Sequence, residues 1–295
     1  MQIFAHVYNG SQYRDIIKNW DNANISPSLI YSHRSTAYDR ATYPSMMHFH
    51  DYYELLLYDG GEVRYVFDGS SHRLGPGDLV LIPPGKLHVS MIEADSTVYN
   101  RYVFYFFPDA FDAIHGSALL DFARKRDTAV FFHMPEEQHR QLLQKLHQLD
   151  KLSASTTEAD KALSFATAIE VFYLLNNVSE RDFTPDDSCS PRLREIQQYI
   201  DEHFQDITSV SQVAEHFFYS REYISRLFRR ELHTTVADYL LTRRISYCRQ
   251  LLAENASLLD ICFQAGFGSV SAFNRAFRRV MGQTPAQYRR QQRKE

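Results

Sequence analysis

Three histidines and one glutamate share one segment of the sequence, at spacings that could bring their side chains together. His48 and His50 are separated by one residue, Glu54 follows them, and His88 lies further along the chain. Because alternate residues of an extended strand project to the same face, His48, His50 and Glu54 would share one face. A returning strand could add His88. Three imidazoles and one carboxylate suit a divalent transition metal, so the pattern indicates a metal or polar ligand site.

The segment that carries these side chains is expected to form short β-strands. Runs of β-branched, aromatic and aliphatic residues alternate with clusters of Gly, Pro, Asp and Ser that favour turns. Short strands at regular spacing are typical of an antiparallel sandwich or barrel. The expected strands are Tyr53 to Tyr58, Val63 to Phe67, Leu79 to Ile82 and Val98 to Phe107.

The pattern becomes helical after Pro135. Leucines recur at helical spacing, followed by a second helical stripe of Leu163, Ala166, Ile169 and Tyr173. These stripes predict a helical hairpin that packs on the barrel or serves dimerisation.

We therefore predict a two-domain α+β protein with an N-terminal antiparallel β-barrel and a C-terminal all-α region. The predicted segments are a barrel at 1–135, a helical hairpin at 136–180, a polar linker at 181–191 and a helical domain at 192–295.

Charge and composition narrow the class of protein. The 295-residue chain has a net charge of −4, but residues 188–295 carry 16 Lys and Arg against 11 Asp and Glu. The basic part is the one that would face a polyanion. The sequence has no run of about 18 apolar residues, and it lacks a signal-peptide pattern and any metal-like pairing of its three cysteines. We expect a cytoplasmic protein without a membrane partner.

Two segments of the helical region repeat each other. Ser220 aligns with Ser269, and Arg226 aligns with Arg275. In each copy the Ser can cap a helix whose Arg residues lie largely off its apolar stripe, and a short helix and a turn precede it. This arrangement describes a helix-turn-helix, and two copies could enter successive major grooves about 34 Å apart. Residues 236–254 could form a connecting helix that spans roughly 28 Å.

Residues 192–292 resemble the DNA-binding domain of AraC/XylS-type regulators. The resemblance is carried in the second copy by Gly266-Phe267, Ser271-Ala272-Phe273-Asn274-Arg275-Ala276-Phe277-Arg278-Arg279, Gly282-Gln283-Thr284-Pro285 and Tyr288-Arg289, and in the first by Ala214, Ser220, Tyr223-Ile224-Ser225-Arg226-Leu227-Phe228 and Tyr239-Leu240. His233 departs from the pattern because a Gly usually ends the first recognition helix. Cys248 and Cys262 stand at positions usually held by Ala.

The resemblance implies which side chains contact double-stranded DNA. Base-reading positions would be Glu222, Ser225 and Arg226 in the first helix and Val270, Ser271, Asn274 and Arg275 in the second. Their chemistry agrees, since Arg can bond guanine, Asn can bond adenine and Val can pack on a thymine methyl. Phosphate contacts would come from Arg221, Arg229, Arg230, Arg278 and Arg279.

The N-terminal segment resembles the cupin fold, whose metal-binding motif has the spacing of His48, His50, Glu54 and His88. Thr42 and Ile92 depart from that motif. Three interpretations stay open: a polar pocket wall for an organic effector, a divalent transition metal that helps to hold the effector, or purely structural histidines. Tyr65 and Arg64 are further candidate effector contacts.

Together these features predict an effector-responsive transcription regulator, with no catalytic residues and no required cofactor. The family resemblance favours an activator of a carbohydrate catabolic or transport operon, working as a homodimer with RNA polymerase. Two alternatives stay open: a metal-dependent cupin enzyme fused to a DNA-binding domain, and a regulator that responds to an aromatic or other non-sugar ligand.

Overall fold

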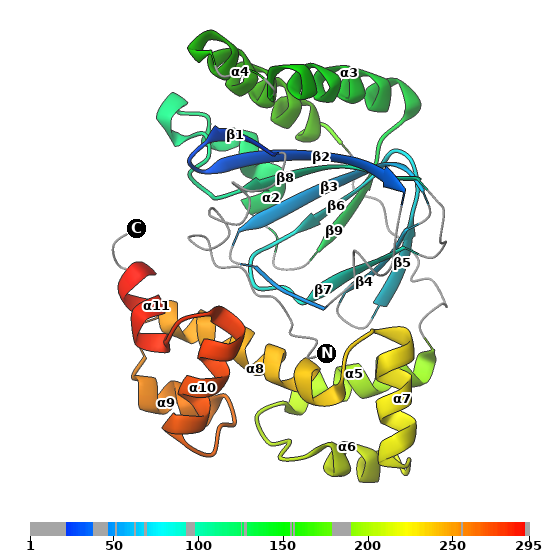
Figure 1. The fold of residues 1–295 in the computed structure, drawn as a ribbon, viewed down its shortest axis with the longest axis vertical. Helices are drawn as coiled ribbons and strands as arrows, with labels where there is room; N and C mark the ends of the chain where they lie inside the picture. The colour runs from blue at the N-terminus through cyan, green and yellow to red at the C-terminus, as the bar shows by residue number, and fades with distance from the viewer. Residues whose placement is uncertain are drawn as a thin grey trace.

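The structure, a computed structural model, has a β-sheet domain followed by a helical domain (Figure 1). It describes residues 22–37, 47–50, 52–61, 63–67, 70–92, 98–124, 126, 129–153, 155, 157–178, 190–254 and 256–292. The predicted α+β class with two domains is confirmed. The predicted linker lies almost wholly outside the described residues.

The larger of two antiparallel sheets forms one wall of the N-terminal domain. Its strands, in spatial order, are β1 (Asn22–Ser26), β2 (Leu29–Ala37), β8 (Val98–Phe106), β3 (Tyr53–Gly60), β6 (Asp78–Ile82) and β9 (Val130–His133). Within β3, Leu55 pairs with Phe104 of β8 and with Leu81 of β6. β3 is therefore a central strand, and its residues from Tyr53 to Tyr58 are buried on both faces of the sheet.

The smaller sheet faces the larger one and closes the barrel. It consists of β5 (Ser70–Leu74), β4 (Val63–Phe67) and β7 (His88–Ile92). Because strand residues alternate between faces, Tyr65 and Phe67 point into the barrel core, whereas Val66 points outward.

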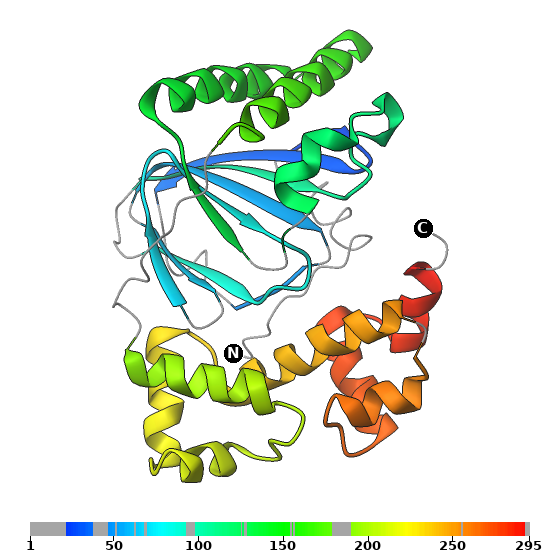
Figure 2. The same ribbon diagram turned by 180° about the vertical axis from the view of Figure 1, so that it is seen from behind.

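Helices cover the outer face of the larger sheet (Figures 1 and 2). These are the short η1 (Asp112–Ile114), η2 (Ser117–Leu120) and α2 (Asp121–Arg124), followed by the hairpin of α3 (Glu136–Ser153) and α4 (Glu158–Leu175). The predicted hairpin is present, and α3 buries its leucine stripe. On α4, however, Leu163 and Tyr173 of the predicted stripe are 45% and 64% exposed, and Val171 and Phe172 face the core instead.

A polar contact fixes α3 on the sheet. The Tyr31 hydroxyl donates to Asp150 Oδ1 at 2.6 Å, and His33 Nδ1 lies 2.8 Å from Asp150 Oδ2. Burial lowers the pKa of His33, but its hydrogen bonds with Asp150 and Asn100 and the nearby carboxylates together outweigh burial and raise the pKa of the imidazole. The hairpin is therefore held on the sheet by the carboxylate of Asp150 as well as by the buried leucines of α3.

The C-terminal domain is helical throughout its described residues. Its helices are α5 (Pro191–His203), α6 (Val210–His216), α7 (Arg221–Glu231), α8 (Val236–Ala253), α9 (Leu258–Gln264), α10 (Val270–Met281) and α11 (Pro285–Gln292). In the part of the chain that is described, no helix combines the length and the hydropathy needed to cross a membrane.

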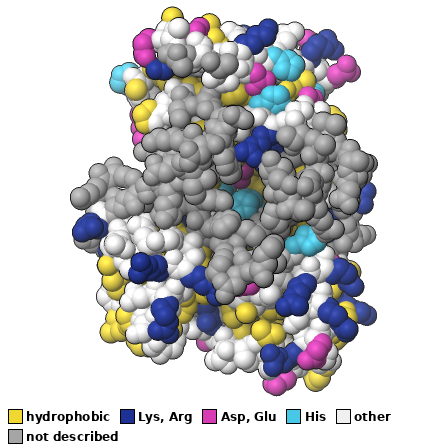
Figure 3. All heavy atoms as spheres, viewed as in Figure 1, with side chains coloured by type: hydrophobic (Ala, Val, Ile, Leu, Met, Phe, Trp, Pro, Cys, Tyr) yellow, Lys and Arg dark blue, Asp and Glu magenta, His cyan; other side chains and the backbone are white. Residues whose placement is uncertain are grey.

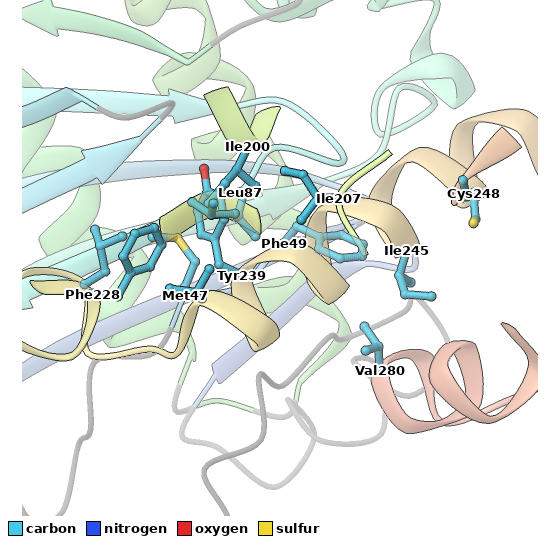
Figure 4. Close-up of a cluster of buried hydrophobic side chains, with 14 of the residues drawn as sticks. Met47, Phe49, Leu87, Ile200, Ile207, Phe228, Tyr239, Ile245, Cys248 and Val280 are labelled. Atoms are coloured by element: carbon cyan, nitrogen blue, oxygen red, sulfur yellow. The ribbon is translucent and has the colours of Figure 1, made fainter. Parts of the chain in front are cut away.

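One buried apolar cluster joins the two domains (Figure 4). Met47, Phe49 and Leu87 of the barrel lie in the same cluster as Tyr239 and Ile245 of α8. Val66, Val89 and Met91 on the outer face of the smaller sheet belong to the same cluster, so the helical domain packs against this face.

The expected strands are confirmed, with ends that differ by two residues or fewer. The sequence pattern does not predict β1, β2, β5, β7 or β9. Several of these, such as Ser70–Leu74, carry polar or charged residues that hide the strand pattern.

Candidate DNA interface and histidine site

Both predicted helix-turn-helix units are present and capped as expected. The first is α6 and α7, and the second is α9 and α10. Ser220 Oγ accepts the backbone N–H of Tyr223 at 3.1 Å, and Ser269 Oγ accepts that of Ala272 at 3.2 Å. His233 has a φ of +51° after α7, and Gly282 has a φ of +71° after α10. His233, which stands where the family usually has Gly, therefore lies at the end of a helix.

The buried stripes of α7 and α10 fix which side chains face outward. Ile224, Leu227 and Phe228 are buried on α7, as Phe273 and Phe277 are on α10. The predicted DNA contacts lie off these stripes: Arg221, Glu222, Arg226, Arg229, Arg230, Val270, Ser271, Arg275, Arg278 and Arg279 are exposed, and Ser225 and Asn274 are half-buried. The fold thus leaves every predicted contact at least partly accessible.

Two of the predicted phosphate contacts pair with acidic groups of the chain itself. Arg230 lies 2.6 Å from Glu231 Oε1, and Arg279 lies 3.0 Å from Asp238 Oδ1. The Glu231 carboxylate also accepts the backbone N–H and the hydroxyl of Ser190. These two arginines would have to exchange carboxylate partners for phosphate on binding DNA.

Helix α8 sets the separation of the two units. It has 18 residues, which span about 27 Å at 1.5 Å per residue. The turns before α7 and α10 both lie on the side of the helical domain that faces away from the sheets (Figures 1 and 2). Lys and Arg side chains are spread over this half of the molecule in Figure 3.

The histidine site forms where the segment at 47–50 meets β7 and β3. His48 and His88 form a backbone bridge, with two N–H···O bonds of 2.9 Å. Ligand atoms of His48, Glu54 and His88 all lie within 4.8 Å of one another. His50 joins them, with its Nε2 3.0 Å from Glu54 Oε2. The structure therefore brings together all four residues singled out from the sequence.

The hydrogen-bond partners fix the tautomers of His50 and His88. His50 Nδ1 lies 2.7 Å from the carbonyl of Tyr52, and His88 Nδ1 lies 2.8 Å from that of Lys86. Because a carbonyl only accepts, each Nδ1 must carry a proton. The Nε2 atoms of both rings face the same oxygen, Glu54 Oε2, which also only accepts when ionised. A proton or a cation between them would satisfy this arrangement.

Burial and mutual contacts shift the pKa values of two of these groups. Burial lowers the pKa of His50, which disfavours a protonated ring. Burial alone would raise the pKa of Glu54, but the contacts with His50 and His88 hold it well below its ordinary value. A neutral imidazole beside a carboxylate, with Nδ1 bonded to a carbonyl, is the usual setting of a metal-ligating histidine.

The two further candidate effector contacts lie on opposite faces of β4. The Tyr65 ring stacks on His88, with centroids 5.8 Å apart, and is buried in the barrel core. Arg64 projects to the other face, which it shares with Val66. Tyr65 therefore borders the histidine site, whereas Arg64 lies on the side of the helical domain.

Polar contacts between the domains adjoin the histidine site. The Arg249 guanidinium of α8 donates to the carbonyl of His50 at 3.3 Å and lies over the Phe49 ring. Ser246 Oγ donates to the carbonyl of Gly85 at 2.7 Å, and the Gly85 N–H donates to His50 at 2.7 Å. The contacts of Ser246 and Arg249 could not be predicted from the sequence, because spacing alone cannot show which face of a long helix meets another domain.

Models of two protein families match the chain. One, described as an AraC-like ligand binding domain, matches residues 34–172, and the other, a helix-turn-helix domain, matches residues 213–291. Together they span the histidine site, the hairpin and both recognition helices.

Similar proteins include transcription regulators. The activators named RhaS from Enterobacter sp. (strain 638) and Klebsiella pneumoniae (strain 342) are each 25% identical, over 85% and 82% of this chain and 88% and 86% of their own lengths. An uncharacterised regulator of Staphylococcus aureus (strain MRSA252) is 22% identical over 78% of this chain, which spans only 30% of that protein. Among solved structures, the C-terminal domain of AraT, a response regulator from Geobacillus stearothermophilus, is 32% identical over 35% of this chain and 87% of its own, with a TM-score of 0.34.

Proposed function

Because the chain belongs to the AraC-type family of DNA-binding transcription regulators, we propose that it is an activator of a carbohydrate operon. Two capped recognition helices on one connecting helix carry the proposal, since each presents an exposed arginine, Arg226 or Arg275, off its buried stripe. Each arginine would bond guanine in one of two successive major grooves.

The proposed effector is a small carbohydrate bound beside the histidine site. Tyr65 and Tyr52 offer aromatic faces for the apolar face of a sugar ring, and the rings stack on His88 and His50 respectively. His48 and Glu54 offer partners for hydroxyl groups. This combination of aromatic faces and hydrogen-bonding side chains supports a sugar as the ligand.

Effector binding would reach the helical domain through His50. Its imidazole borders the proposed effector site, while its carbonyl accepts hydrogen bonds from Gly85 and Arg249. A ligand that moves this residue changes the contact with α8, and so biases the orientation of the recognition helices.

The proposed active form is a homodimer that recruits RNA polymerase. The outward stripe of α4, with Leu163 and Tyr173 45% and 64% exposed, supports dimerisation through the hairpin because a second copy would cover these apolar groups. Two copies could then occupy paired half-sites.

A divalent transition metal is a second occupant that we propose for the same site. His48, Glu54 and His88 would hold it, with His50 as a further ligand, and the opposed Nε2 and carboxylate atoms support this assignment. When bound, the ion would supply an electrophilic centre for the hydroxyl groups of an effector. An enzymatic role has no support beyond this ligand set, and the similar proteins named above are transcription regulators.

Replacing Arg275 should weaken binding to the specific site more than binding to random DNA. A site selected from a random library with the purified protein supplies the specific probe. For Arg275→Ala we expect a loss of about 1–3 kcal/mol on that probe, measured by fluorescence anisotropy. Arg140→Ala, which changes an exposed arginine of α3, is the control. Equal losses on specific and random DNA would show that Arg275 reads no base.

A sugar that binds beside Tyr65 should raise the unfolding temperature of the full chain. In a thermal-shift screen of monosaccharides, a ligand at 100 times its Kd adds about 2.7 kcal/mol to the free energy of unfolding. Tyr65→Ala should abolish the shift, and Tyr173→Ala should keep it. A shift produced by aromatic acids and by none of the sugars would contradict the carbohydrate assignment.

The metal proposal predicts one bound ion per chain. Protein dialysed against Zn²⁺, Ni²⁺ or Mn²⁺ and then against buffer is analysed by mass spectrometry of the elements. We expect one equivalent of one metal in the native chain and none in the double variant His48→Ala/His88→Ala. His147→Ala, at an exposed position of α3, should retain it. Equal metal content in all three proteins would refute the site.

A further inference from the structure

The turns of the two helix-turn-helix units begin with the same hydrogen-bond pattern but have different residues. After α6, the N–H of Phe218 donates to Glu215, and that of Tyr219 donates to Ala214. After α9, the N–H of Gly266 donates to Phe263, and that of Phe267 to Cys262. Phe218 and Gly266 are thus equivalent, and both have positive φ values, +56° and +77°.

The second copy shows why this position favours glycine. A Cβ on Gly266 would lie 2.1 Å from the carbonyl oxygen of Gln205, so no side chain fits there. The residue that follows provides the inward anchor of each turn: Phe267 is buried against Phe273, and Tyr219 packs on Tyr223. The fold therefore requires nothing of residue 218 beyond a left-handed conformation.

Phe218 meets that requirement poorly and exposes a large apolar ring. A bulky residue with a positive φ is a conformational outlier, whereas histidine, as at His233, tolerates this region better. The ring of Phe218 is 96% exposed, the highest value among the large exposed hydrophobic residues described. In the free protein Phe218 therefore combines a strained backbone conformation with an exposed apolar ring. Residues with strained backbone conformations cluster at functional sites.

The position of the turn identifies the partner. Phe218 precedes Ser220, the cap of the recognition helix α7, and Arg221 and Arg226 are exposed on that helix. When α7 enters a major groove, the DNA backbone passes close to these cationic groups, so their charge favours DNA over a neutral protein surface as the partner of Phe218.

We propose that Phe218 is a DNA-contacting residue, whose ring packs on the deoxyribose or thymine methyl groups at the edge of the major groove read by α7. The inference rests on the proposed use of α7 as a recognition helix. Burial of the ring on DNA compensates for its exposure in the free protein.

Phe218→Gly tests this proposal because it separates folding from binding. Glycine relieves the left-handed strain, so we expect an unchanged or higher unfolding temperature. On the selected DNA site we expect about 10-fold weaker binding, with an unchanged dependence on salt because no charge is lost. Phe218→Tyr keeps the ring and should retain the affinity.

Arg226→Ala, measured in parallel, separates the contact by Phe218 from the use of α7 as a recognition helix. If Arg226→Ala weakens binding and Phe218→Gly does not, the contact by Phe218 is refuted while the role of α7 stands. If neither variant weakens binding, the use of α7 itself is refuted. A lower unfolding temperature of Phe218→Gly would also overturn the proposal, because the ring would then serve the fold.

DNA in which deoxyuridine replaces thymidine identifies the group that is contacted. If the loss caused by Phe218→Gly disappears on this DNA, the ring packs on thymine methyl groups. If the loss persists, the ring packs on deoxyribose. Both results support a DNA contact.

Discussion

The packing of α8 against three partners is the constraint on which the rest of the molecule depends. Arg244 donates to the carbonyls of Phe204 and Ile207, which ties the helix to the end of α5 and the loop before α6. Ile245 and Cys248 of α8 share a buried apolar cluster with Phe277 and Val280 of α10, so the second unit is tied to the same helix. Ser246 and Arg249 contact the barrel. One rigid element therefore connects both recognition helices with the barrel.

This arrangement gives the histidine site a short physical route to the recognition helices. The outer face of the smaller sheet packs on the helical domain, while its inner face borders the histidine site. Since residues of extended backbone alternate between faces, Phe49 packs against the helical domain while its neighbour His50 contacts Glu54 in the histidine site. Binding of a ligand at the histidine site would displace residues on the inner face. Because the strand is closely packed, such a displacement would also move the residues on its outer face that contact α8.

Much of this could be predicted from the sequence, for identifiable reasons. The two helix-turn-helix units follow from local signals, since Ser220 and Ser269 cap helices whose apolar stripes repeat. The spacing of His48 and His50 was sufficient to predict that they act together, whereas Glu54 lies on β3, beyond a bend at Tyr52, and joins them through tertiary packing. Strand β5 could not be found in this way, because polar residues such as His72 and Arg73 mask its pattern. The domain contact of Arg249 was also hidden, since it depends on tertiary packing and not on local sequence. The unusual conformation of Phe218 could not be predicted either, because its positive φ is visible only in the backbone of the structure.

Hydrogen–deuterium exchange of the full chain, with and without its selected DNA site, tests the coupling through α8 most directly. The account predicts slower exchange in α7 and α10 on DNA binding, together with altered exchange in β7 and at Gly85. In Arg249→Ala the changes in the barrel should disappear, while the protection of α7 and α10 remains. If the native chain shows protection of α7 and α10 with no change anywhere in the barrel, the two domains are not coupled through this contact.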